Sequence, residues 1–351
     1  MQIRSWAASL CILPIVGCQP AAGESPSPAP SADAPITFAV VGDAPVIDPA
    51  DYGAAYLLPG ATVVHDGTVH LFAVAFFADP SERPRVVHLV SDDGVAWTGG
   101  PEASVLDDFG LELDGVGPVP SSAFVADDGT WVMVGGGRLP GGQRSTVWRA
   151  TAPGPDGPWT AHPVPILEPA PSGWDTAIVD HPSLVEGPDG ELMAYGGADL
   201  PAPNRNRIGL ATSDDGVTWT RIDATMDGAD DAHALGPDAC GLDARTMVEP
   251  HLLAVGGGHL LVFGVMPEGS DTDMQIVSAT STDGRTWTCA SGHEALGSDD
   301  IPGGRSIHSF AVLDHPDQPP TLLIEVLGDD HSTLWLGRAV GPATGSRARL
   351  P

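Results

Sequence analysis

The stretch from Trp174 to Trp219, WDTAIVDHPSLVEGPDGELMAYGGADLPAPNRNRIGLATSDDGVTW, contains the pieces of one complete β-sheet unit. Its first half holds two short apolar runs joined by Pro188-Asp189-Gly190, which is the composition of a β-hairpin turn. Its second half, Ile208–Trp219, adds a third apolar run, a turn at Asp214-Asp215-Gly216 and a Trp side chain that can cover that turn. We therefore predict a three-stranded meander here, with a fourth strand after Trp219.

The same unit recurs along the chain with a period of about sixty residues. Copies of its first hairpin begin near Leu58, Val119, His181, Glu249 and Ile307, and copies of its third strand begin at Val86, Val147, Ile208, Ile276 and Leu334. The two patterns are independent and agree in number and spacing, which indicates a repeat protein, and four-stranded units of this length are typical of propeller blades. The sequence thus predicts an all-β fold consisting of a single five-bladed β-propeller.

The fifth copy is one strand short, because the chain after Gly341 reads PATGSRARLP and has no strand pattern. An apolar run at Ile36–Val41, ITFAVV, precedes the first copy and has no partner of its own. We predict that this run pairs with Leu334–Val340 and closes the ring, since an unpaired strand would leave an exposed sheet edge.

The N-terminal segment has the features of an export signal. It carries Arg4, then an apolar run that is too short to cross a bilayer, then small residues. Its end, Ile15-Val16-Gly17-Cys18, resembles the lipobox of bacterial lipoproteins, which implies acylation of Cys18; simple cleavage of the signal is the alternative. We expect an exported monomer that is anchored by lipid to a bacterial membrane or cell surface and contacts the membrane only through that anchor. The expected parts are a signal peptide (1–17), a tether rich in Pro, Ala and Ser (18–35), the propeller (36–341) and a C-terminal tail (342–351).

Charge and cysteine content narrow the classes of partner and compartment. The formal net charge is −31, and no cluster of basic residues is present that could neutralise a row of phosphates, which excludes a nucleic-acid partner. Of the four cysteines, Cys11 lies in the signal and Cys18 is the candidate for acylation. We expect Cys240 and Cys289 to form a disulfide in an oxidising compartment, which would contribute roughly 4 kcal/mol on the chain-entropy model.

The candidate functional residues stand at the start of the first strand of each unit. In a propeller these strands face the central channel, so polar residues there converge on the axis. Blades one and two are apolar at this place, whereas blades three to five carry Asp180-His181, Glu249-Pro250-His251 and His308. We predict that Asp180 and Glu249 form a pair of carboxylates, which is the arrangement used to cleave glycosidic bonds.

At these residues the chain resembles the five-bladed propeller glycosidases of the arabinanase, xylosidase and fructosidase type, over residues 36 to 341. The resemblance is carried by the blade repeats, the SDDG-x-x-W turns, WDTAIVDHPSL, VEPHLL and RSIHSF. It implies that Glu249 is the general acid, that Asp180 tunes this acid and that His308 lies near the axis. The family's general base is not matched, because Leu58-Pro59-Gly60 stands in its place, and only Asp51 or Asp114 could replace it from a loop.

Two functions remain open at this stage: glycoside hydrolysis, or glycan or protein binding without catalysis in a degenerate channel. Neither requires a cofactor, although His and carboxylate groups also suit calcium or another divalent cation. A third hypothesis is a sialidase, because TSDDGVTW matches the Asp-box pattern, but the turn chemistry of Asp and Gly explains this motif without catalysis. The residues expected to contact carbohydrate are Trp174, Asp175, His181, His251, Arg305 and His308.

Overall fold

The computed structural model describes residues 36–79, 81–100, 119–139, 144–187, 190–199, 206–226, 235–236, 240, 244–267, 273–289, 296–315, 318–328 and 331–340. The regular elements named in this part of the chain are β-strands and two short 3₁₀ helices, Pro49–Tyr52 (η1) and Ser298–Asp300 (η4). None of its helices is long and apolar enough to cross a membrane.

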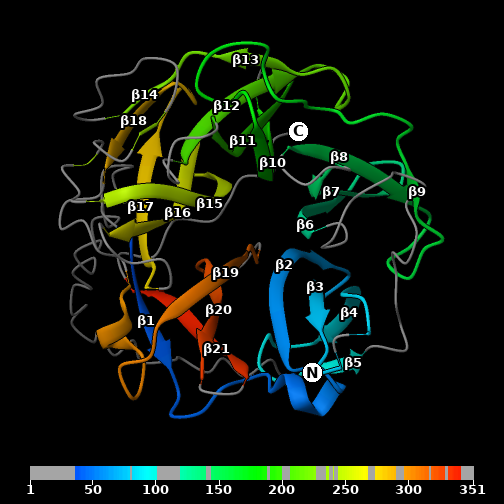
Figure 1. Cartoon of the computed structure of the whole chain (residues 1–351), viewed down its shortest axis with the longest axis vertical. Coiled ribbons are helices and arrows are strands. Elements are labelled where there is room, and N and C mark those ends of the chain that lie inside the picture. The colour runs from blue at the N-terminus through cyan, green and yellow to red at the C-terminus, as the bar shows by residue number, and fades with distance from the viewer. Residues whose placement is uncertain are drawn as a thin grey trace, which may run out of the picture.

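Five antiparallel blades form a ring, as Figure 1 shows, and the prediction of a single five-bladed β-propeller is confirmed. The strand predicted after Trp219 is also present, as Thr220–Ile222. From the axis outward, blade one consists of β2 (Tyr56–His65), β3 (Thr68–Phe76), β4 (Arg85–Ser91) and β5 (Thr98–Gly100), and blade two of β6 (Val119–Val125), β7 (Trp131–Arg138), β8 (Ser145–Ala152) and β9 (Thr160–Ala161). Blade three consists of β10 (Ile178–Gly187), β11 (Gly190–Ala198), β12 (Arg207–Ser213) and β13 (Thr220–Ile222), and blade four of β15 (Ala244–Val255), β16 (Gly258–Pro267), β17 (Gln275–Ser281) and β18 (Thr286–Cys289), with β14 (Thr225–Met226) parallel to β18. Blade five consists of β19 (Ile307–Leu313), β20 (Thr321–Leu327), β21 (Ser332–Val340) and β1 (Thr37–Val41).

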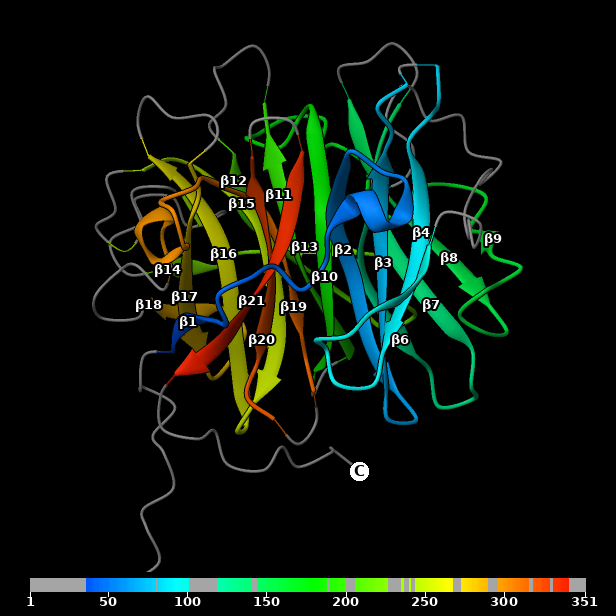
Figure 2. The same ribbon diagram turned by 90° about the horizontal axis from the view of Figure 1, so that it is seen from below.

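The ring is closed by the N-terminal strand, as predicted. Strand β1 is antiparallel to β21, with Thr37 opposite Val340 and Val41 opposite Leu336. Figure 2 shows the blue β1 beside the arrowhead end of the red β21, at the edge of the fifth blade. Every described residue of β1 is thus paired along one side, and β21 has partners on both sides.

Hydrophobic side chains from neighbouring blades form the core. Five clusters of buried residues are found in the described part of the chain, one in each seam between adjacent blades. The second strands are buried along nearly their whole length, because both faces pack on other strands; all seven residues from Val69 to Ala75 in β3 are buried. The apolar area buried in these seams supplies the main driving force for folding and aligns the five first strands around one axis.

The DG-x-x-W turns stabilise the outer parts of the blades. In blade three, the Ser213 hydroxyl bonds to Asp215, and Asp215 Oδ1 accepts the backbone N–H groups of Val217 and Thr218. Gly216 has φ +68°, which favours glycine. The same bonds recur at Ser91-Asp93 and Ser281-Asp283. These contacts account for the Asp-box match as turn structure.

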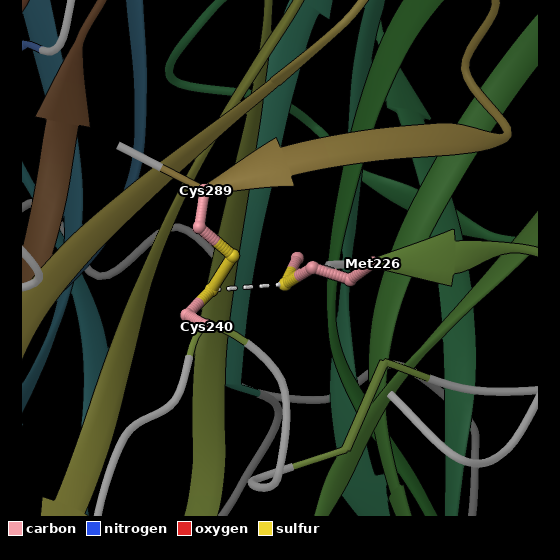
Figure 3. Close-up of a disulfide and its surroundings, with 3 residues drawn as sticks. All are labelled: Met226, Cys240 and Cys289. Carbon is pink, nitrogen blue, oxygen red and sulfur yellow. Dashed lines mark hydrogen bonds between the residues drawn. A yellow bond between two sulfur atoms is a disulfide. The ribbon is translucent and has the colours of Figure 1, made fainter. Parts of the chain in front are cut away.

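The disulfide between Cys240 and Cys289 is present in blade four (Figure 3). It joins the segment before β15 to strand β18, which lies between β17 and β14, across a sequence separation of 49 residues. The Sγ atom of Cys240 lies 3.3 Å from Sδ of Met226 on β14, so the bridge is packed inside the outer layer of this blade.

Candidate functional site in the axial pocket

An irregularity at the same level of all five first strands builds the site. The pairing register with the second strand shifts between Leu58 and Ala61, Pro120 and Ser122, Asp180 and Ser183, Val248 and His251, and Ile307 and Ser309. A β-bulge of this kind bends the strand and re-aims a side chain. The bulged residues of blades three, four and five are His181-Pro182, Glu249-Pro250 and His308.

The bulges surround a pocket at the axis that encloses about 290 Å³ of empty space, counting its open mouth. Blades one and two supply apolar and backbone surface together with Ser121, blades three and four supply the ionisable groups, and blade five supplies Ser309 and Phe310. The lining residues are Leu58, Pro59, Gly60, Val119, Pro120, Ser121, His181, Glu249, Pro250, His251, Ser309 and Phe310.

Glu249 is the carboxylate that lines the pocket. Its Oε2 atom accepts a hydrogen bond from the Ser309 hydroxyl at 3.0 Å and another from the backbone N–H of Phe310 at 3.2 Å. Within the described residues, Oε1 has no hydrogen-bond partner and is the atom available to a ligand. Burial raises the pKa of Glu249, against the opposing effects of the positively charged His181 and of these two donors.

His181, and not Asp180, is the blade-three counterpart of Glu249. Both residues are bulged, both precede a proline and both have positive φ, +46° for His181 and +50° for Glu249. Asp180 is placed one residue earlier, outside the pocket lining, where its Oδ1 atom lies 3.2 Å from Nδ1 of His181. The expected pair of carboxylates facing one channel is therefore replaced by a Glu249–His181 pair with Asp180 behind the imidazole.

His308 has the same kind of support. Its Nδ1 atom donates to Oε2 of Glu325 at 2.8 Å, and the Glu325 carboxylate is buried, with 2% of the side chain exposed. This hydrogen bond, the larger effect, raises the pKa of His308 against the effect of burial. Glu249 thus stands between two imidazoles, His181 and His308, each held by a carboxylate.

His251 connects two blades. It lines the pocket, but its Nε2 atom donates to the carbonyl of Phe310 at 3.1 Å and its ring packs on the Phe310 ring. Burial lowers its pKa to about 4, so the ring is neutral at neutral pH. Ser183, at the equivalent place in blade three, accepts the backbone N–H of Leu252 and makes a similar tie.

Trp174, Asp175 and Arg305 lie outside the pocket lining. The Trp174 ring stacks on Tyr195 with centroids 5.9 Å apart, and Asp175 is buried, where it accepts bonds from the Tyr195 hydroxyl and from Nε of Arg221. The expectation of Trp174 as an axial stacking surface is therefore not supported, since the ring is part of the packing of blade three. Arg305 is exposed in the loop before β19.

The first blade brings no carboxylate to the pocket. Pro59 and Gly60 occupy its bulge, and a Cβ atom on Gly60 would lie 2.5 Å from the backbone oxygens of Phe72 and Pro120, so no side chain fits there. Asp51 lies on η1, the blue helix at the outer rim in Figure 1, and does not reach the axis, which corrects that expectation. Asp114 lies outside the described residues. No group of three or more metal-binding side chains is found in the described part of the chain.

The comparisons with known proteins agree with this architecture. No protein-family model matches the chain and no curated protein matches its sequence. The structure of BT0996 in a complex with RGII has a TM-score of 0.61 at 15% identity, covering 91% of this protein and 94% of that one. A Bombyx mori GH32 beta-fructofuranosidase has a TM-score of 0.61 at 13% identity, over 87% of this protein and 62% of that one.

A thermostable family-43 glycoside hydrolase is similar as well, with a TM-score of 0.60 at 14% identity over 84% of this protein and 95% of that one. The fold is that of the five-bladed propeller glycoside hydrolases. At this identity the likeness is one of fold, so the chemistry depends on the residues of this pocket.

Sequence reasoning did not identify Ser309, Phe310 and Glu325, although all three organise the site. Glu325 had a detectable signal: it is a lone acid in the apolar run TLLIEVL of β20, and a carboxylate in a buried strand needs a partner. The backbone N–H of Phe310 had no signal, because a donor of that kind is present at nearly every residue and only the fold aims it at Glu249.

Proposed function

We propose that the protein acts on carbohydrate as a glycoside hydrolase-like propeller and cleaves a glycosidic bond at the mouth of the axial pocket. The observation that carries this proposal is the Glu249 carboxyl group, which lines the pocket, is oriented by Ser309 and Phe310 and keeps Oε1 without a partner among the described residues. The shared fold of several glycoside hydrolases supports the same assignment.

The test is release of sugar from a panel that contains arabinan, xylan, fructan and RGII. We expect wild-type protein to release sugar from one member and Glu249→Gln to lose about 10²–10⁴ of that rate, since general acid–base groups contribute on this order. Glu168→Gln is the matched control, because Glu168 is exposed and is not among the residues that line the pocket. Unchanged turnover in Glu249→Gln would contradict the proposal.

A second function, carbohydrate binding without hydrolysis, is favoured by one specific observation. Glu249 is the sole carboxylate among the described pocket residues, and the blade-one position is blocked by Pro59 and Gly60. Under this alternative, a glycan binds with measurable heat in calorimetry, no sugar is released, and Glu249→Gln changes the dissociation constant only.

We further propose that the protein is exported and tethered to a bacterial membrane through acylated Cys18, with residues 18–35 as the tether. The lipobox-like Ile15-Val16-Gly17-Cys18 supports this placement. A tethered propeller would act on polymers near the cell surface.

A further inference from the structure

We propose that the second proton-transfer group of the axial pocket is the His181 imidazole held by Asp180, and that His181 donates the proton while Glu249 accepts one. This assignment rests on the proposed glycosidic hydrolysis. It reverses the role that the sequence suggests for Glu249, and it turns Asp180 into a positioning residue that acts through His181.

The backbone gives the first reason. His181 and Glu249 hold positive φ at equivalent bulges of neighbouring blades, a conformation that costs on the order of 1–3 kcal/mol for a residue other than glycine and that clusters at functional sites. Proline cannot adopt it, because its ring fixes φ near −65°. Pro59 occupies the equivalent position of blade one and cannot have a positive φ. Of these three positions, only His181 and Glu249 have this backbone conformation.

The hydrogen bonds of Glu249 give the second reason. Both donors, the Ser309 hydroxyl and the Phe310 N–H, approach the same oxygen, Oε2. Hydrogen bonds donated to a carboxylate stabilise its charged form. Burial is the larger effect and raises the pKa of Glu249, so what the two bonds decide is the orientation of the group, with Oε1 left as the oxygen that can accept a proton.

The contacts of His181 give the third reason. Its Nδ1 atom faces Asp180, so Nε2 is the ring atom left for a ligand among the described residues. The other titratable groups that face this ring are Glu249 and His251, and His251 is neutral. Burial opposes the charge, but Asp180 and Glu249 outweigh it and raise the pKa of His181 to about 9. His308, which also faces Glu249, is paired with Glu325.

A protonated His181 and an ionised Glu249 can together carry out the hydrolysis of a glycosidic bond. His181 Nε2–H gives its proton to the glycosidic oxygen as the bond between that oxygen and the anomeric carbon breaks. A water oxygen bonds to the anomeric carbon, and Oε1 of Glu249 takes the proton that this water loses. The cycle ends when the proton on Glu249 returns to His181 through solvent, so no co-reactant is consumed.

Leaving-group chemistry distinguishes the donor from the acceptor. The probes are matched dinitrophenyl and methyl glycosides of α-L-arabinofuranose and β-D-xylose, because a dinitrophenolate departs without protonation and a methoxide does not. We expect the rate of His181→Asn to fall by about 10²–10⁴-fold on the methyl glycoside and by less than tenfold on the dinitrophenyl glycoside.

Glu249→Gln should lose activity on both glycosides and regain activity on the dinitrophenyl glycoside when azide is added. Asn is chosen at 181 because it tolerates positive φ, and His162→Gln is the control.

The reverse pattern, in which Glu249→Gln keeps dinitrophenyl activity and His181→Asn does not, would overturn the assignment. Wild-type protein that hydrolyses neither these probes nor any member of the polysaccharide panel would instead contradict the proposed hydrolysis. The protonation state of His181 can then still be measured without turnover. In a nuclear magnetic resonance titration we expect His181 to stay protonated above pH 7.5 and to lose its proton at lower pH in Asp180→Asn, with partial recovery in Asp180→Glu. A neutral His181 at pH 7 in the wild-type protein would overturn the proposal.

Discussion

His70, His88 and Asp156 form a hydrogen-bonded chain between the first two blades, apart from the axial pocket. His88 Nδ1 lies 2.8 Å from Oδ1 of Asp156, and His88 Nε2 lies 2.9 Å from Nδ1 of His70. The carboxylate can only accept, so His88 donates from Nδ1 and its Nε2 accepts the Nδ1–H of His70. Both rings are buried, at 7% and 6% exposure, against Trp131 and Phe72. At the scale of single residues, the hydrogen-bond partners thus set the tautomers of both rings.

This hydrogen-bonded chain predicts a loss of stability in mild acid. Burial, followed by the neighbouring His88 and His65, lowers the pKa of His70 to about 4, with Asp156 acting weakly in the other direction. The unfolded protein binds this proton near pH 6.5, whereas the folded protein binds it only near pH 4. The free energy of unfolding therefore has its full value above pH 6.5 and falls by up to about 3 kcal/mol as the pH drops toward 4.

The measurement is urea unfolding between pH 7.5 and 4 for wild-type protein and for His70→Asn, whose amide can still donate to His88 but does not titrate in this range. We expect a smaller loss of unfolding free energy in the variant. The pKa of His251, also lowered to about 4, contributes equally to both proteins. Parallel curves for the two proteins would show that His70 does not carry the effect.

At the scale of elements, the closure of the ring depends on a strand from the opposite end of the sequence. Phe38 of β1 is 5% exposed and packs in one cluster with Ile324 and Trp335 of the fifth blade. Strand β1 therefore contributes both backbone pairing and core, and without it β21 would present an unpaired edge.

Truncation tests this element. A protein that begins at Ile36 should unfold cooperatively with the stability of the wild-type propeller, whereas one that begins at Gly42 should be strongly destabilised and prone to aggregate through β21. Phe38→Ala in the longer protein should cost about 3–5 kcal/mol, the range for removing a buried phenylalanine. Size-exclusion chromatography and urea unfolding give the two readouts. A soluble, stable protein beginning at Gly42 would show that closure by β1 is dispensable.

At the scale of the whole molecule, the proposed site and the proposed anchor belong to separate parts of the sequence. The ionisable groups that line the pocket come from blades three and four, while Cys18 precedes the propeller. The formal net charge of −31 favours solubility through mutual repulsion, so attachment to a membrane would depend on the lipid and not on the protein surface.

Cell fractionation tests the anchor. When the full-length protein is expressed in a bacterium, we expect it in the membrane fraction, and we expect Cys18→Ser to move it to a soluble fraction. Cys11→Ser is the matched control, since Cys11 lies inside the predicted signal and should leave the distribution unchanged. Membrane recovery of Cys18→Ser equal to wild type would exclude acylation of this residue as the anchor.

The sequence by itself determined the number of blades, the closing strand, the pairing of Cys240 with Cys289 and the position of Glu249 at the axis. The blades and the position of Glu249 follow from local patterns, namely the alternation of apolar residues, the turn composition and the repeat period. The closing strand and the disulfide follow from counting, because one strand and two cysteines are left without another assignment.

Only the tertiary structure decided which residue of blade three accompanies Glu249. A bulge inserts residues into one strand and shifts every following side chain, so His181 faces the pocket and Asp180 stands behind it. The donors that hold Glu249 come from a blade about sixty residues further along the sequence, while the carboxylate that holds His308 comes from the next strand of the same blade. Distances between blades depend on how five sheets pack around one axis, and no local pattern encodes them.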